Sequence, residues 1–126
     1  MVRLLFTFLS LCLLSCQSGD SRNWTGGVDK NSNGIRDDVD TWISSKSKDN
    51  IRLAKALETL ARVNPASCEY SIKARCINEL SSDGIILQVE LLDLQLNTKE
   101  LRENFENNVK NCPRIDDRNI NYKCDL

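Results

Sequence analysis

Apolar residues recur three and four positions apart through most of the chain, in segments separated by short polar stretches. This spacing places them along one side of a helix, so it predicts a set of amphipathic helices. We expect four to five of them. In chain order they are a short helix that carries Val39, Trp42 and Ile43 and ends near Ser45, a second that follows Asn50 and is ended by Asn64-Pro65, then 66–80 and 85–96, and a last one that begins after Asn97 and carries Leu101, Phe105 and Val109.

Polar side chains mark where these helices should begin and end. Asp49 or Asn50 is expected to cap the second helix, because a short polar side chain accepts a hydrogen bond from the free N–H groups of a first turn. The polar segment 81–84 closes the third helix, and Asn97, followed by Glu100 three positions later, is typical of a cap for the last one. The expected buried side of the second helix carries Ile51, Ala54, Leu57, Leu60 and Ala61, and that of the third carries Tyr70, Ala74 and Ile77.

The segment 85–96 is the most apolar part of the chain after the N-terminal fifteen residues. Its alternation of Leu87, Val89 and Leu91 permits a strand, whereas its leucine content, together with two acidic residues, favours a helix. We expect a buried central helix. Ile85, Val89, Leu92 and Leu96 follow helical spacing.

Length and composition limit the possible functions. A chain of 126 residues forms at most one small domain. Its 17 basic and 18 acidic residues leave a formal charge of −1, which does not suit a nucleic-acid-binding protein. It contains no histidine, so most hydrolase triads are excluded and an enzyme is not expected. A hydrolase that uses paired carboxylates is the less favoured alternative, because no pair is singled out by its spacing.

The first fifteen residues have the pattern of an export signal. Arg3 supplies a positive start, and 4–14 is an apolar run. This run of eleven residues is too short to cross a bilayer as a helix, which takes about 20 residues. Residues 1–15 are therefore expected to be removed as a signal peptide.

The motif Leu13-Leu14-Ser15-Cys16 resembles the lipobox of bacterial lipoproteins, with an aliphatic residue three positions before a cysteine and a small residue directly before it. The resemblance implies cleavage ahead of Cys16 and attachment of lipid to its thiol. Several acyl chains would hold the protein firmly at a membrane. Gln17 stands where an aspartate would resemble the inner-membrane retention signal, so the outer membrane is the expected location.

The segment 16–28 is polar and contains several glycines, and we expect it to form a lipidated flexible tether. One alternative is an ordinary secretory signal in which Cys16 carries no lipid. A secreted eukaryotic protein is a third possibility, because Asn23-Trp24-Thr25 fits the N-glycosylation sequon.

The segment 29–40, D-K-N-S-N-G-I-R-D-D-V-D, has oxygen-bearing side chains at the spacing of a calcium-binding loop. A twelve-residue calcium loop takes ligands from positions 1, 3, 5, 7, 9 and 12, with a backbone carbonyl at position 7 and a glycine at position 6 for the turn. The residues at these ligand positions are Asp29, Asn31, Asn33, Ile35, Asp37 and Asp40, and Gly34 stands at position 6. Oxygen ligands without sulfur or imidazole suit Ca²⁺.

This loop resembles EF-hand-like loops, and more closely the loops of thrombospondin type 3 repeats, which have an apolar residue at position 7 and aspartate at position 12. An EF-hand has its apolar residue at position 8, occupied here by Arg36, and usually glutamate at position 12. The resemblance implies a single calcium loop that enters a helix and holds the ion as a fixed structural part. The alternative is an ordinary turn at Asn33-Gly34, with Asp37 capping the helix and Asp40 completing a capping box.

Four cysteines remain when Cys12 leaves with the signal peptide and Cys16 takes lipid, namely Cys68, Cys76, Cys112 and Cys124. An even number in an exported chain argues for two disulfides, and zinc is disfavoured because no C-x-x-C pair occurs. On an unbroken helix Cys68 and Cys76 lie about 12 Å apart, beyond the reach of a disulfide. An antiparallel return of the chain then favours Cys76 with Cys112 and Cys68 with Cys124. Local pairs, Cys68 with Cys76 and Cys112 with Cys124, stay open if that helix breaks.

Together these features predict an all-α fold, a small disulfide-stapled helical domain over 29–126 behind an N-terminal calcium-type loop. The order of parts resembles uncharacterised small helical secreted proteins of bacteria. The expected function is that of a calcium-binding lipoprotein, anchored in the outer membrane through Cys16 on its periplasmic or surface face, that binds an envelope or surface protein. A structural envelope lipoprotein without a specific partner is the alternative.

Overall fold

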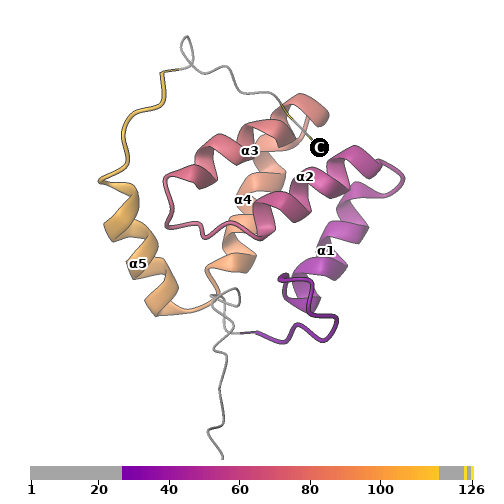
Figure 1. Cartoon of the computed structure of the whole chain (residues 1–126), viewed down its shortest axis with the longest axis horizontal. Helices are drawn as coiled ribbons and strands as arrows, with labels where there is room; N and C mark the ends of the chain where they lie inside the picture. The colour runs from indigo at the N-terminus through magenta and orange to yellow at the C-terminus, as the bar shows by residue number, and fades with distance from the viewer. Residues whose placement is uncertain (1–26, 117–123, 125) are drawn as a thin grey trace, which may run out of the picture.

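The computed structural model describes residues 27–116, 124 and 126 (Figure 1). Its helices are α1 (Asp37–Ser47), α2 (Ile51–Ala61), α3 (Glu69–Leu80), α4 (Gly84–Gln95) and α5 (Lys99–Val109). The described ranges contain five helices and no strand, so the all-α prediction is confirmed, and the strand alternative for 85–96 is excluded. The predicted signal peptide, Cys16 and the tether as far as residue 26 lie outside the described residues.

The first four helices enclose the core. α1 packs on α2, α2 on α3 and α3 on α4, and α1 also meets α4, which closes the arrangement. Each large aliphatic side chain that is fully buried contributes about 1.5–3 kcal/mol to the free energy of folding. The core side chains are Ile35, Val39, Ile43, Leu53, Ala56, Leu57, Leu60, Ala61, Tyr70, Ala74, Cys76, Ile77, Leu87 and Leu91.

The buried face of α2 differs in part from the predicted one. Leu57, Leu60 and Ala61 are buried as expected, but Ile51 is 80% exposed. Leu53 is buried in its place. Leu53 lies four positions before Leu57 and seven before Leu60, so these large side chains form one face, whereas Ile51 lies on the opposite side of the helix.

The helix at 85–96 is confirmed as α4, but it is buried on one side only and not all round. Leu87 and Leu91 point into the core, whereas Ile85 is 71% exposed and Val89 is 62% exposed. The physical reason lies at Gly84, where α4 begins. A Cβ atom there would lie 2.7 Å from the Cα of Asn78, so α3 and α4 approach each other closely on this side of α4.

A buried polar contact joins three helices. Gln95 is 1% exposed. Its Oε1 accepts a hydrogen bond from the Tyr70 hydroxyl at 2.8 Å, and its Nε2 donates to the Ala61 carbonyl at 2.9 Å. The side chain is thus satisfied at both ends, as a buried amide must be. Burial also raises the pKa of the Tyr70 hydroxyl, which stays protonated as a donor.

Two helices begin at polar caps, one of which sequence reasoning placed one residue early. The Asn50 side chain accepts from the N–H of Leu53 at 3.0 Å, as predicted. The cap of α5 is Thr98, whose hydroxyl accepts from the N–H of Leu101 at 3.2 Å, and not Asn97. Because Asn and Thr are both favoured at an N-cap, residue type alone did not show which of the two adjacent residues caps the helix.

The third helix begins at Glu69, later than predicted. The residues before it form a turn, in which the N–H of Ser67 donates to the carbonyl of Asn64 at 2.9 Å. The Asn64 side chain also accepts from the N–H of Ala66 at 2.9 Å. An Asn side chain that satisfies the backbone locally competes with helix formation, which delays the helix.

Both disulfides join α3 to the C-terminal part of the chain, but their partners are exchanged relative to the favoured pairing. The bonds are Cys68–Cys112 and Cys76–Cys124, each with a Cα–Cα distance of 5.3 Å. The local pairs are also excluded, because α3 does not break between Cys68 and Cys76.

The path of α4 and α5 explains the exchange. α4 runs back toward the start of α3, and α5 ends beside it, so Cys112 meets Cys68 before the chain returns to Cys76 (Figure 1). Sequence reasoning instead assumed that the return would reach the middle of α3 first.

We predict that peptide mapping of the non-reduced protein yields one linked pair with Cys68 and Cys112 and another with Cys76 and Cys124. The Cys68→Ser/Cys112→Ser variant should keep the second bond and lose about 2–4 kcal/mol of unfolding free energy, because the loop between the two residues is no longer closed. A peptide that joins Cys76 to Cys112 would contradict the fold.

Candidate metal centre

The loop 29–40 turns sharply and leads directly into α1. Ser32 and Gly34 both have positive φ angles, 56° and 83°. No atom lies within 4 Å of the position that a Cβ on Gly34 would occupy, so glycine is required here by its backbone conformation and not by lack of space. This is the sharp turn that the glycine at position 6 predicted.

The Asp29 carboxylate closes this turn. Its Oδ1 accepts from the N–H of Asn33 at 3.2 Å, and its Oδ2 accepts from the N–H of Gly34 at 2.9 Å. Hydrogen bonds from backbone N–H groups stabilise the charged carboxylate. Position 1 of the loop is therefore fixed against positions 5 and 6.

The Asp40 carboxylate, in the first turn of α1, binds the side chains of two Asn residues of the loop. The Nδ2 atoms of Asn31 and Asn33 both donate to Oδ2 of Asp40, at 3.2 and 2.8 Å. The Oδ1 atoms of Asn31 and Asn33 accept from the backbone N–H groups of Asn33 and Ile35, at 3.1 and 2.7 Å, so each amide is hydrogen-bonded at both ends. The side chains at loop positions 3, 5 and 12 are thus joined to one another, and the side chain at position 1 is joined to them through the N–H of Asn33.

Of the two remaining predicted ligand positions, Asp37 bonds to the loop through its side chain, whereas Ile35 does not. Oδ1 of Asp37 accepts from the N–H of Lys30 at 2.9 Å. Ile35 is 2% exposed and its side chain lies in the core, while its N–H donates to Oδ1 of Asn33 at 2.7 Å. The structure thus brings five of the six predicted ligand side chains into one hydrogen-bonded loop and leaves Ile35 with only its backbone to offer.

Of the alternative interpretation, the turn at Asn33-Gly34 is present, but the predicted cap at Asp37 is wrong. The N-cap residue of α1 is Arg36, which makes no side-chain capping bond, and Asp37 is already the first helical residue. The first turn of α1 contains Asp37, Asp38 and Asp40, whose negative charges interact favourably with the positive end of the helix dipole.

Arg36 was not identified as important from the sequence. It is 7% exposed, and its Nη2 donates to the Leu94 carbonyl at 2.9 Å and to Oδ2 of Asp38 at 2.8 Å. A side chain at Gly27 would collide with the stem of Arg36, so the start of the described chain packs directly on it. The sequence feature that could have identified Arg36 is its place at loop position 8, where EF-hands bury an apolar residue.

Two arginines hold the loop against the helical body. Arg36 reaches the last turn of α4, and Nε of Arg62, at the end of α2, donates to the Asn33 carbonyl at 3.0 Å. The hydrogen bond from Arg36 also holds the pKa of the Asp38 carboxyl below its usual value. Because this folded-state pKa is depressed, the stability from the pair is present above the unfolded pKa and is lost as the pH falls through the folded one.

The donor set of the loop fits a hard cation. Three carboxylates, two Asn amides and a backbone carbonyl supply oxygen atoms, which Ca²⁺ prefers. Among the described residues, no three His, Cys, Asp or Glu side chains gather closely enough to hold a metal by themselves. A cation here would therefore depend on the Asn side chains as well as the carboxylates.

Comparisons with known proteins give no family for this chain. No family model, curated protein or solved structure matches it. Within the described part of the chain, every helix is too short or too polar to cross a bilayer.

We predict that Arg36→Met lowers the unfolding free energy by about 1–3 kcal/mol, because it leaves the Leu94 carbonyl in the last turn of α4 without its donor. Urea unfolding of the wild type and the variant measures the difference. Arg52→Met, which removes an exposed arginine from α2, is the matched control and should change stability by less than about 0.5 kcal/mol. Equal losses in the two variants would mean that Arg36 does not join the loop to α4.

Proposed function

We propose that this protein is a calcium-binding lipoprotein of the bacterial outer membrane that acts as an interaction module of the cell envelope. The observation that carries the calcium proposal is the hydrogen-bonded cluster of Asp29, Asn31, Asn33 and Asp40, whose spacing is that of ligand positions 1, 3, 5 and 12. These side chains lie far enough apart in sequence that only a turned loop can join them.

In this proposal, Ca²⁺ is held by oxygens of Asp29, Asn31, Asn33, Asp37 and Asp40 and by the Ile35 carbonyl. The ion neutralises carboxylates that otherwise repel one another within a short loop. Extracellular modules of this kind bind Ca²⁺ at about 10⁻⁴–10⁻³ M, so the ion serves as a structural part and not as a switch. The two arginines that hold the loop to α2 and α4 then transmit its order to the helical body.

The membrane anchor rests on the lipobox resemblance at Cys16. Two or more acyl chains give stable attachment, whereas one chain gives only marginal binding. The exposed apolar residues of α4 support an interaction module in preference to a purely structural protein, because isolated apolar groups at a surface need no partner but a contiguous set does.

We expect Ca²⁺ to stabilise the mature chain, tested in a Cys16→Ser form that stays unlipidated. A concentration of 10 to 100 times the dissociation constant stabilises by about 1.4–2.7 kcal/mol, which raises the midpoint of thermal unfolding by roughly 5–15 °C relative to chelator. Asp29→Asn should abolish this rise, because it removes a charged ligand while keeping an acceptor for the N–H groups of the turn.

Asp49→Asn, at an exposed position between α1 and α2, is the matched control and should keep the full calcium response. Equal midpoints with Ca²⁺ and with chelator in the wild type would remove calcium from the proposal.

We expect mass spectrometry of the protein purified from its native membrane to show an N-terminal Cys16 that carries lipid. In detergent phase separation, the native protein should enter the detergent phase and the Cys16→Ser protein should stay in the aqueous phase. A free Cys16 thiol, or an N-terminus elsewhere, would refute the anchor and leave the calcium proposal standing.

A further inference from the structure

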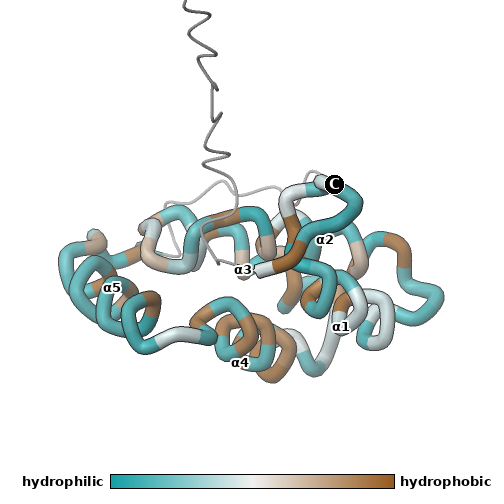
Figure 2. Tube along the Cα trace, turned by 90° about the horizontal axis from the view of Figure 1, so that it is seen from below, coloured by the Kyte–Doolittle hydropathy of each residue, from teal (hydrophilic) through white to brown (hydrophobic). Residues whose placement is uncertain are grey.

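The helix α5 packs on the rest of the domain through few side chains. It stands at the end of the domain away from α1 and α2 in Figure 1 and again in Figure 2. The close helix–helix contacts within the described ranges all lie among α1, α2, α3 and α4, and none of the residues of α5 is buried. Its apolar residues Leu101 and Phe105 are partly buried, and Val109 is 40% exposed. Apolar burial therefore contributes little to holding α5 against the body.

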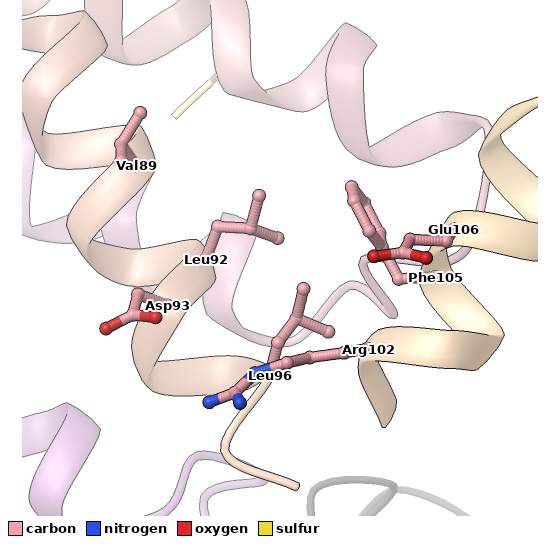
Figure 3. Close-up of a pocket in the computed structure, with 7 residues that line it drawn as sticks. All are labelled: Val89, Leu92, Asp93, Leu96, Arg102, Phe105 and Glu106. Atoms are coloured by element: carbon pink, nitrogen blue, oxygen red, sulfur yellow. The ribbon is translucent and has the colours of Figure 1, made fainter. Parts of the chain in front are cut away.

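Two hollows separate α5 from the body. One, of about 300 Å³, lies between α4 and α5, and its apolar walls include Leu92, Leu96 and Phe105 (Figure 3). The other, of about 130 Å³, lies between the start of α3 and the end of α5, and the Cys68–Cys112 disulfide forms part of its wall. Leu92 and Phe105 line both hollows. Because atoms beside a void lack contact partners on that side, α5 gains little from packing here.

The Cys68–Cys112 disulfide attaches α5 covalently to the start of α3. Cys68 is exposed and Cys112 is partly exposed, so a thiol in solution can reach this bond. The other bond differs, since Cys76 is 3% exposed in the middle of α3 and Cys124 packs on the core. A reductant therefore meets the first bond and not the second while the domain stays folded.

The place of Cys68 in the fold favours opening of this bond. Cys68 is the N-cap residue of α3 and makes no side-chain capping bond. A thiolate produced there lies at the positive end of the helix dipole, which stabilises a negative charge. The acidic residue of the same turn, Glu69, is paired with Lys73 at 3.7 Å, which offsets part of its charge. Cys68 is therefore the better leaving group of the two sulfurs.

We propose that Cys68–Cys112 is a redox-controlled clasp, which a dithiol reductant opens to release α5 from the body while the second disulfide keeps the C-terminal part of the chain attached. A thiolate of the reductant bonds to Sγ of Cys112, and the bond between the two cysteines breaks with its electron pair on Sγ of Cys68. The second thiol of the reductant then bonds to the first and expels Cys112 as a thiolate. The reductant is oxidised to a disulfide, two electrons pass to the protein, and the two thiol protons pass to the two cysteine sulfurs.

Release removes the support that keeps α5 helical. A helix of 11 residues is marginal by itself in water. Asn104, Asn107 and Asn108 lower its intrinsic propensity further. Once detached, α5 unwinds, and the two hollows open into one apolar surface around Leu92. The clasp uses neither the loop 29–40 nor a lipid, so it stands independently of the proposed function.

Graded dithiothreitol, added to the native mature chain in its Cys16→Ser form, tests the clasp. Alkylation followed by peptide mapping should show Cys68 and Cys112 modified at least about ten times faster than the two cysteines of the second bond. Hydrogen exchange of the α5 amides should then rise at least about tenfold, while the amides of α1–α4 stay protected. Loss of both bonds together with global unfolding would overturn the proposal.

Two variants separate the bond from packing as the cause. Cys68→Ser/Cys112→Ser should show the fast α5 exchange without any reductant. Phe105→Ala, which removes the apolar contact but keeps the bond, should raise α5 exchange by less than about threefold. A rise in Phe105→Ala as large as in the double variant would mean that packing holds α5, and a reduced wild type whose α5 stays protected would mean the same; either result overturns the clasp.

Reversibility is tested on the same reduced protein. Oxidised glutathione, added once the dithiothreitol is removed, should restore the Cys68–Cys112 bond and the protection of the α5 amides. Mispaired cysteines, or an α5 that stays unprotected after the bond has formed again, would refute a reversible device.

Discussion

The arrangement of the helices depends on the hydrogen bonds made by the last turn of α4. The buried Gln95 side chain joins α3 through the Tyr70 hydroxyl and α2 through the Ala61 carbonyl. One residue earlier, the Leu94 carbonyl accepts from Arg36, which lies between the N-terminal loop and α1. Two successive residues, Leu94 and Gln95, therefore connect α4 to α2, to α3 and to the N-terminal loop. Because buried polar groups are costly when unpaired, these contacts restrict the helices to one arrangement more strictly than apolar packing alone does.

The inward orientation of Gln95 also determines which residues of α4 are exposed to solvent. Gln95 faces inward together with Gly84, Leu87 and Leu91, whereas Ile85, Ile86 and Val89 are exposed. α5 shelters only the end of that side, and its attachment depends on the Cys68–Cys112 bond more than on a buried face of its own. A helix that is apolar on both sides and covered on one is a surface suited to association.

Two sets of hydrogen bonds hold the N-terminal loop in place, one within the loop and one between the loop and the helical body. Within the loop, Asp29 and Asp40 bind the backbone N–H groups and the Asn amides. From outside, Arg36 and Arg62 tie it to α4 and α2. The contacts within the loop join residues a few positions apart, so the sharp turn at Gly34 could be predicted from the sequence. The arginine contacts were not, because each joins residues far apart in the chain.

The sequence by itself determined which segments are helical, where most of them begin, and where the N-terminal loop turns, since these depend on periodicity, caps and turn residues within a few positions of one another. The tertiary structure alone decided which side of α4 faces the core, because its apolar residues surround the helix and the choice rests on the close approach at Gly84 and the partners of Gln95. It also decided the disulfide partners, because the direction in which α5 leaves α4 sets which cysteine comes first within reach. Local chemistry fixes elements, whereas contacts between distant residues fix their orientation.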